Sequence, residues 1–291
     1  MDLFVAQLIN GLVIGCTYAL VATGFNLLVL ISGVIHFSYP IVVVFCMYVI
    51  WMVFEASGGS TILAVLSALV AGLGLSMLAE PLFRPMIRRG ATIQTFIMSL
   101  AIAMVLNFLM ASRINHGHAV SFSESLASYE AAIQFGYSAV SWGQLTTVIG
   151  AVLIVGALFL FFYGTMPGRA FRAVAQNKEV AHLLGINEGR MAKASFAIAG
   201  ILAGATAIFL AMSLGSAYAG LGDLLALKMI AIVLFAGIGN LVGGMAAALI
   251  LGVAETMATA YISGQWSNAV AFGMILAIVM ARPQGLFGTR V

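Results

Sequence analysis

The chain has 291 residues, of which 63% are hydrophobic and only 7% are charged, and its formal net charge is +3. Its mean hydropathy of +1.14 leaves too few polar side chains to cover a water-soluble globular domain. The composition therefore predicts a membrane protein, and the small positive charge gives no reason to expect a nucleic-acid partner.

Apolar segments long enough to cross a bilayer recur along the chain. They lack the strict alternation of barrel strands, so they favour helices, which satisfy their backbone hydrogen bonds within one segment. We expect an all-α polytopic bundle in one transmembrane domain over residues 1–291, with nine spans, or eight if one is re-entrant. The expected spans are 4–30, 36–54, 61–80, 91–111, 143–163, 194–213, 222–240, 243–262 and 267–281.

Most basic residues lie in three stretches, and they predict the orientation. Arg84, Arg88 and Arg89 form a short basic loop, residues 164–193 a long one, and Arg282 with Arg290 a third. The positive-inside bias places all three in the cytoplasm. The polar segment 112–142 is poor in basic residues and is expected on the opposite face. The N-terminus is then outside and the C-terminus cytoplasmic.

Two stretches hold too many helix breakers and polar groups to continue a helix. They are Ile31–Pro40 (ISGVIHFSYP) and Gly237–Gly244 (GIGNLVGG). Broken backbone at membrane depth is tolerated only where it is buried in protein or faces an aqueous cavity. We therefore expect broken or re-entrant segments at both places.

Two ionisable residues, Lys228 and Glu255, lie inside apolar spans. A charge there is costly unless it is paired or hydrated. Three interpretations remain open: an ion pair between the two, extension of Lys228 to the outer interface near Asp223, or a role in a proton or substrate path.

Catalytic and metal-binding signals are weak. The chain contains no G-x-x-x-x-G-K-[ST] phosphate cradle, so ATP dependence would have to come from a partner. His116 and His118 form an isolated H-x-H without a third ligand, which favours a solvated loop over a zinc site. We therefore expect neither an enzyme nor a bound metal or cofactor.

The long basic loop predicts one helix from Arg169 to Leu184, preceded by Pro167 and Gly168 and stopped by Gly185. Apolar residues recur along it at helical spacing. A helix this short cannot bury such a stripe alone. Two interpretations are open: docking onto a partner protein, or lying on the lipid headgroups.

Within this loop, Glu179–Gly185 (EVAHLLG) resembles the E-A-A-x-x-x-G pattern with which bacterial ABC-importer permeases dock into their ATPase subunit. Three further stretches resemble the branched-chain amino acid permeases of the LivH and LivM type. Gly15–Gly24 (GCTYALVATG) is similar to G-x-x-Y-A-L-x-A-x-G, and Ala181–Asn187 (AHLLGIN) is similar to A-x-L-L-G-I-N. Ala236–Glu255 is similar to G-G-x-G-S followed by G-x-x-x-G-x-x-x-G-x-x-E.

The chain departs from the family pattern after the first span. The family has N-F-A-H-G where this chain has His36–Pro40 (HFSYP), and Asn240 replaces the serine of the glycine turn. These changes leave the substrate open.

The resemblance implies a permease subunit of an ABC importer in the bacterial inner membrane, importing branched-chain or other hydrophobic amino acids. Urea, amides, or organic and aromatic acids are the alternatives within the family. An ion-coupled secondary transporter or channel using Lys228 and Glu255 is the alternative outside it. Implied partners are two ABC ATPase subunits, a paralogous permease subunit forming a heterodimer, a periplasmic substrate-binding protein and membrane lipid. ATP would be bound only by the partner subunits.

The resemblance also assigns roles along the chain. It implies that residues 164–193 form a cytoplasmic coupling loop and that residues 112–142 form a periplasmic loop. The residues expected to couple to the ATPase are Arg169, Phe171, Arg172, Glu179, Ala181, Leu184 and Gly185. Those expected at the substrate path or gate are Tyr18, His36, Phe37, Ser38, Tyr39, Gly237, Gly239 and Asn240.

Overall fold

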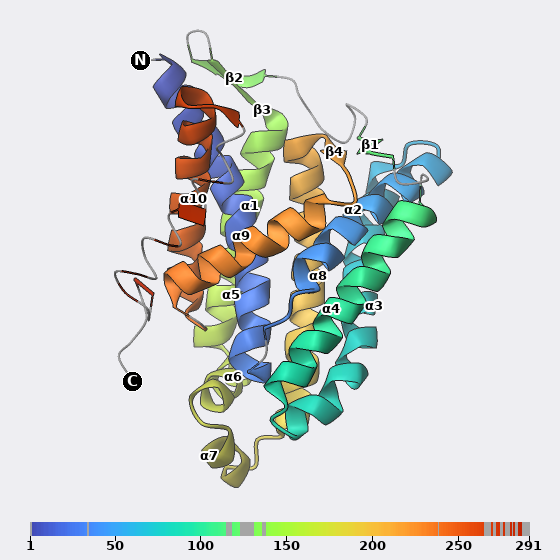
Figure 1. Cartoon of the computed structure of the whole chain (residues 1–291), viewed down its shortest axis with the longest axis vertical. Helices are drawn as coiled ribbons and strands as arrows, with labels where there is room; N and C mark the ends of the chain where they lie inside the picture. The colour runs from blue at the N-terminus through green and yellow to red at the C-terminus, as the bar shows by residue number, and fades with distance from the viewer. Residues whose placement is uncertain are drawn as a thin grey trace.

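The computed structural model describes residues 2–33, 35–114, 118–122, 131–135, 138–237 and 239–264, with isolated residues between 269 and 286. It is a polytopic bundle of long helices, as the composition predicted (Figure 1). The helices are α1 (Asp2–Ser32), α2 (Tyr39–Ala56), α3 (Thr61–Arg88), α4 (Thr92–Ser112), α5 (Trp142–Gly164), α6 (Met166–Gln176), α7 (Lys178–Leu183), α8 (Glu188–Leu214), α9 (Leu221–Ala236) and α10 (Leu241–Tyr261).

Seven helices in the described part of the chain are long and apolar enough to cross a membrane: α1, α2, α3, α4, α5, α8 and α10. The predicted span 222–240 is instead the 16-residue helix α9, which ends where Gly237 adopts a φ of +91°. Sixteen residues extend about 24 Å, which is short of a bilayer core of about 30 Å. The predicted span 267–281 lies almost entirely outside the described residues, so the count of eight or nine stays a prediction.

Helix α1 forms the centre of the bundle and packs most extensively against α10. Small residues allow this approach: a Cβ added to Gly252 of α10 would lie 2.6 Å from the Cα of Gly15. Gly72 of α3 packs in the same way against Gly200 and Gly204 of α8. Because lipid does not drive helices together, such close backbone contacts hold the bundle.

Within the described residues, four short strands depart from the predicted all-α fold. They form two antiparallel pairs: β1 (Val120–Ser121) with β4 (Ser216–Ala217), and β2 (Ala131–Phe135) with β3 (Ser138–Ser141). Figure 1 shows them at the end of the bundle that carries the N-terminus, while α6 and α7 project from the opposite end. The segments expected to be periplasmic and cytoplasmic therefore lie at opposite ends of the molecule.

The predicted basic loop after the third span is wrong in one respect. Helix α3 continues through Pro81 and Pro85 to Arg88, so Arg84 and Arg88 both belong to a helix. Its guanidinium donates to the carboxylate of Glu80 one turn earlier, with Nε 2.8 Å from Oε1. The pairing neutralises the carboxylate and lets the helix extend beyond the apolar run.

Candidate functional site

The first predicted break lies between α1 and α2. Gly33 ends α1 with a φ of +74°, and Pro40 lies in the first turn of α2. The linker is exposed at Gly33 and Ile35 and then turns inward, since His36 and Ser38 are each only 3% exposed. The chain therefore carries non-helical backbone inside the bundle, which requires protein or a cavity around it.

A cavity of about 50 Å³ adjoins this linker. His36, Ser38 and Tyr39 line it, together with Ser76 and with apolar side chains from α1, α2, α3, α4 and α8. These apolar side chains are Leu28, Val42, Leu75, Ala79, Ile102, Leu106 and Phe196. The lining combines a mainly aliphatic wall with a few polar groups, as in small-molecule sites, but the volume of about 50 Å³ is below the roughly 300–1,000 Å³ of such sites.

The imidazole of His36 is held by aromatic rings. Its centroid lies 4.0 Å from that of Phe83 and 5.2 Å from that of Phe196. Its Nδ1 lies 3.3 Å from the Ser38 hydroxyl, whereas Nε2 has no hydrogen-bond partner among the described residues. Phe37 lies apart from the cavity lining, and its backbone N–H donates to Ser99 Oγ at 3.2 Å.

The second predicted break lies between α9 and α10. Gly237 and Gly239 have φ values of +91° and +81°, and Asn240 accepts a hydrogen bond from the Gly243 N–H at 2.8 Å to cap α10. None of these three lines the cavity at the first break. The path residues predicted together therefore do not form a single site.

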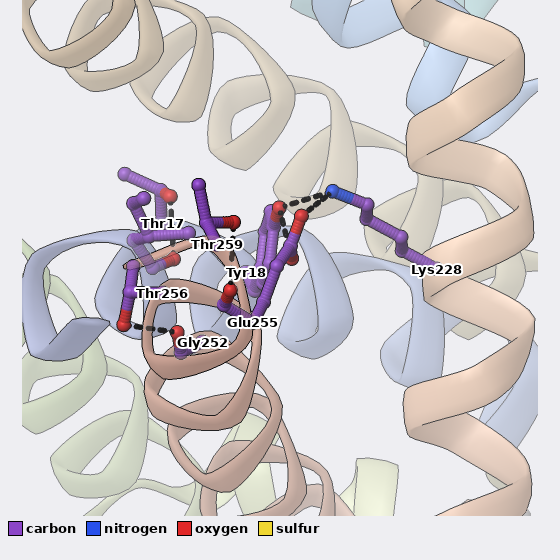
Figure 2. A network of polar contacts seen from close by, with 8 residues as sticks. Thr17, Tyr18, Lys228, Gly252, Glu255, Thr256 and Thr259 are labelled. Atoms are coloured by element: carbon purple, nitrogen blue, oxygen red, sulfur yellow. Dashed lines mark hydrogen bonds and ion pairs between the residues drawn. The ribbon is translucent and has the colours of Figure 1, made fainter. Parts of the chain in front are cut away.

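A polar triad links three helices near the centre of the bundle (Figure 2). Lys228 of α9 forms an ion pair with Glu255 of α10 and donates to the hydroxyl of Tyr18 of α1 at 2.8 Å. Tyr18 in turn donates to Glu255 Oε2 at 3.0 Å. Of the interpretations left open for Lys228, extension towards Asp223 does not match the structure.

Asp223 has a different partner, since its carboxylate accepts a hydrogen bond from Asn107 Nδ2 at 2.9 Å. Tyr18 and Glu255 belong to two of the stretches that resembled the family pattern, at opposite ends of the chain. The fold brings them together, and Lys228 completes the group.

The expected coupling loop contains two helices, α6 and α7, so the prediction of one helix from Arg169 to Leu184 is wrong. Asn177 has extended backbone (φ −158°, ψ 110°), and its side chain accepts the Val180 N–H at 3.0 Å. Asparagine is a preferred N-cap, and here it starts α7 instead of continuing α6. Gly185 ends α7 as predicted, with a φ of +81° and its N–H donating to His182 O at 2.9 Å.

Part of the apolar stripe of this loop faces the protein. Phe171 is 2% exposed and Ala181 is 1% exposed. They pack with Leu27 and Ile31 of α1 and Phe162 of α5. These two residues, which were predicted to contact an ATPase, are therefore unavailable to a partner or to lipid, and they anchor the loop instead.

The other predicted coupling residues lie nearer the surface. Arg169, Glu179 and Gly185 are exposed, and Leu184 is 72% exposed. Arg172 is half-buried, with its guanidinium carbon 4.7 Å from the centre of the Tyr163 ring. His118 is exposed, and His116 lies outside the described residues, so the H-x-H pair stays a prediction.

The chain matches the family described as the branched-chain amino acid transport system, permease component, over residues 7–279. It belongs to this family of ABC transporter permeases. The permease is 28% identical to the high-affinity branched-chain amino acid transport system permease protein BraD of Pseudomonas aeruginosa, over 98% of this chain and 96% of BraD. It is also 28% identical to the LivH protein of Escherichia coli K12, with the same coverage.

A more distant relative of the permease is a probable LivH protein of Methanocaldococcus jannaschii, 22% identical over 90% of this chain and 83% of that protein. Among solved structures, PsaBC from Streptococcus pneumoniae in complex with Fab is similar in fold. Its TM-score is 0.51 at 13% identity, covering 94% of the permease and 91% of that chain. These comparisons place the permease among multi-pass membrane components of amino acid transport systems.

Sequence reasoning missed most of the cavity wall. Ser76 and Phe196 come from helices that are distant in sequence from His36. The one available signal was Ser76, a hydroxyl in a mainly apolar helix, and such serines occur in many helix interfaces.

Proposed function

We propose that the permease is the translocation subunit of an ABC importer that moves branched-chain or other hydrophobic amino acids into a bacterial cell. Separate ATPase subunits drive it, a paralogous permease completes the pore, and a periplasmic protein delivers substrate. In this proposal α6 and α7 face the cytoplasm, and the N-terminus and the strand pairs face the periplasm.

The observation that carries the proposal is the exposed apolar surface of α7. Val180, Leu183 and Leu184 are 50%, 84% and 72% exposed on a helix that projects from the end of the bundle (Figure 1). Aliphatic side chains grouped at a projecting tip are typical of a protein docking surface. They lie within the Glu179–Gly185 stretch that resembles the ATPase-docking pattern.

The cavity beside the α1–α2 linker is the proposed path, with His36, Ser38 and Tyr39 on its wall. Its mainly aliphatic lining favours a substrate with an aliphatic side chain over urea, amides or organic acids. When the ATPases close on ATP, α6 and α7 would move with them and rock the bundle between outward and inward access.

Leu184→Asp and Leu183→Asp test the docking surface. Both positions are exposed, so the permease should fold and reach the membrane. Loss of a central interface anchor costs about 2 kcal/mol, which corresponds to roughly thirtyfold weaker ATPase binding. We expect the ATPases to stop co-purifying and leucine uptake to fall to background.

Met166→Asp is the matched control, because Met166 is also 72% exposed and lies at the other end of the same loop. It should retain the ATPases. Undiminished ATPase binding by both leucine variants would refute the docking role.

Competition of labelled leucine uptake by unlabelled valine, but not by urea or benzoate, would support the substrate class.

A further inference from the structure

Helix α1 has no basic side chain of its own at its C-terminal end to balance the helix dipole. Helix α1 has 31 residues and carries no basic side chain in its last turn. Gly33 N–H and Ser32 Oγ satisfy the carbonyls of Val29 and Leu28. The last carbonyls of a helix carry partial negative charge, which a nearby cation stabilises.

Lys178, the first residue of α7, supplies this cation from a distant part of the chain. Its Nζ donates to the carbonyl of Ser32 at 3.4 Å. It also lies above Gly33, where an added Cβ would be 3.5 Å from Nζ. Lys178 is half-buried at this contact. The ammonium group therefore lies directly over the last residues of α1.

The contact joins two regions that the proposed function needs to communicate. On one side, Lys178 begins the helix that carries the exposed docking residues Leu183 and Leu184. On the other side, α1 leads through Gly33 into the linker whose His36 and Ser38 line the cavity. A shift of α7 would pull on the carbonyl end of α1 at the point where this linker starts.

We propose that Lys178 is a positioning residue that ties the coupling loop to the end of α1 and transmits its movement to the cavity. The inference rests on the proposed function. Lys178 need not contact an ATPase or the substrate. It sets how much of the ATP-driven movement of α7 reaches the α1–α2 linker.

Lys178→Met keeps the length of the side chain and removes the charge, whereas Lys178→Arg restores a cation. The matched control is Lys193→Met on α8, since Lys193 is exposed and makes no hydrogen bond or ion pair within the described residues. The permease is reconstituted in liposomes with its partner permease, binding protein and ATPases. Leucine uptake and ATP hydrolysis are measured in the same vesicles.

We expect Lys178→Met to bind the ATPases normally and to lower the leucine transported per ATP hydrolysed by roughly two- to fivefold, the range for losing one cation at a helix C-terminus. Lys178→Arg should recover most of the ratio, and Lys193→Met should leave it unchanged. If Lys178→Met transports as much leucine per ATP hydrolysed as Lys193→Met does, the inference is overturned, while the proposed function stands. Failure of the wild-type chain to recruit ATPases would overturn both.

Discussion

Breaking the ion pair between Lys228 and Glu255 should destabilise the bundle more than most single substitutions. The two side chains are only 13% and 10% exposed. Lys228→Met leaves a carboxylate without its cation in a low-dielectric interior, and Glu255→Gln leaves the cation without its carboxylate. Removing one partner of a buried pair costs about 3–5 kcal/mol, and a charge at the bilayer centre about 3 kcal/mol. We expect about 3 kcal/mol of lost stability for each variant.

The double variant Lys228→Met/Glu255→Gln distinguishes the loss of the ion pair from the cost of leaving one buried charge without its partner. It removes both charges of the pair, so its loss of stability should be smaller than the sum of the two single losses by at least about 2 kcal/mol. Tyr18→Phe removes only a hydroxyl and should cost about 1 kcal/mol. Unfolding of the purified permease by SDS in mixed micelles measures all four differences. The reasoning would be refuted if the losses of stability of the two single variants added up to that of the double variant. It would also be refuted if each single variant were within about 0.5 kcal/mol of the wild type.

The same double variant tests the function of the pair. If the pair only links α9 to α10, the folded double variant should transport leucine in the complete complex. If Lys228 and Glu255 instead couple transport to an ion, the double variant should be folded but inactive. Uptake by the purified chain alone, driven by an ion gradient in liposomes, would then favour a secondary transporter over an ABC permease.

Two other substitutions test the packing and the cavity. Gly252→Ala should cost about 1–3 kcal/mol in the same unfolding assay, because its Cβ would press on the backbone of Gly15. Gly74→Ala should be neutral or slightly stabilising, since a Cβ there has open space. Ala79→Val adds two methyl groups to the cavity wall and leaves less room for the substrate. If the substrate loses the apolar contact of roughly one methyl group, leucine uptake should fall by about fourfold. The exposed Ala101→Leu is its control, and equal uptake by both variants would exclude the cavity from the path.

The sequence predicted what local chemistry determines. The expected span 91–111 and helix α4 (Thr92–Ser112) differ by one residue at each end, because apolar length and flanking polar residues are local properties. Both breaks were also predicted, since glycine at Gly33 and Gly237 takes a backbone conformation that ends a helix at little steric cost.

The division of the coupling loop could not be predicted in the same way. The helical spacing of apolar residues continues from Phe171 to Ala181 across Asn177, so periodicity alone suggests one helix. An asparagine can continue a helix at a modest cost or cap a new one. The choice depends on whether Phe171 and Ala181 can both reach the end of α1, which is a tertiary property. For the same reason, several environments stayed open for Lys228, and no local pattern indicated the contact of Lys178 with α1.

The anchoring of the loop bears on both breaks at once. The buried cluster under α6 contains Ile31, in the last turn of α1, and Leu241, the first residue of α10, packs against it. Ile31 precedes the α1–α2 linker, and Leu241 directly follows the α9–α10 turn. A displacement of Phe171 would therefore press on the two broken segments together, although they do not share a cavity. In the proposed function this arrangement lets a single ATP-driven movement act on both breaks in one step.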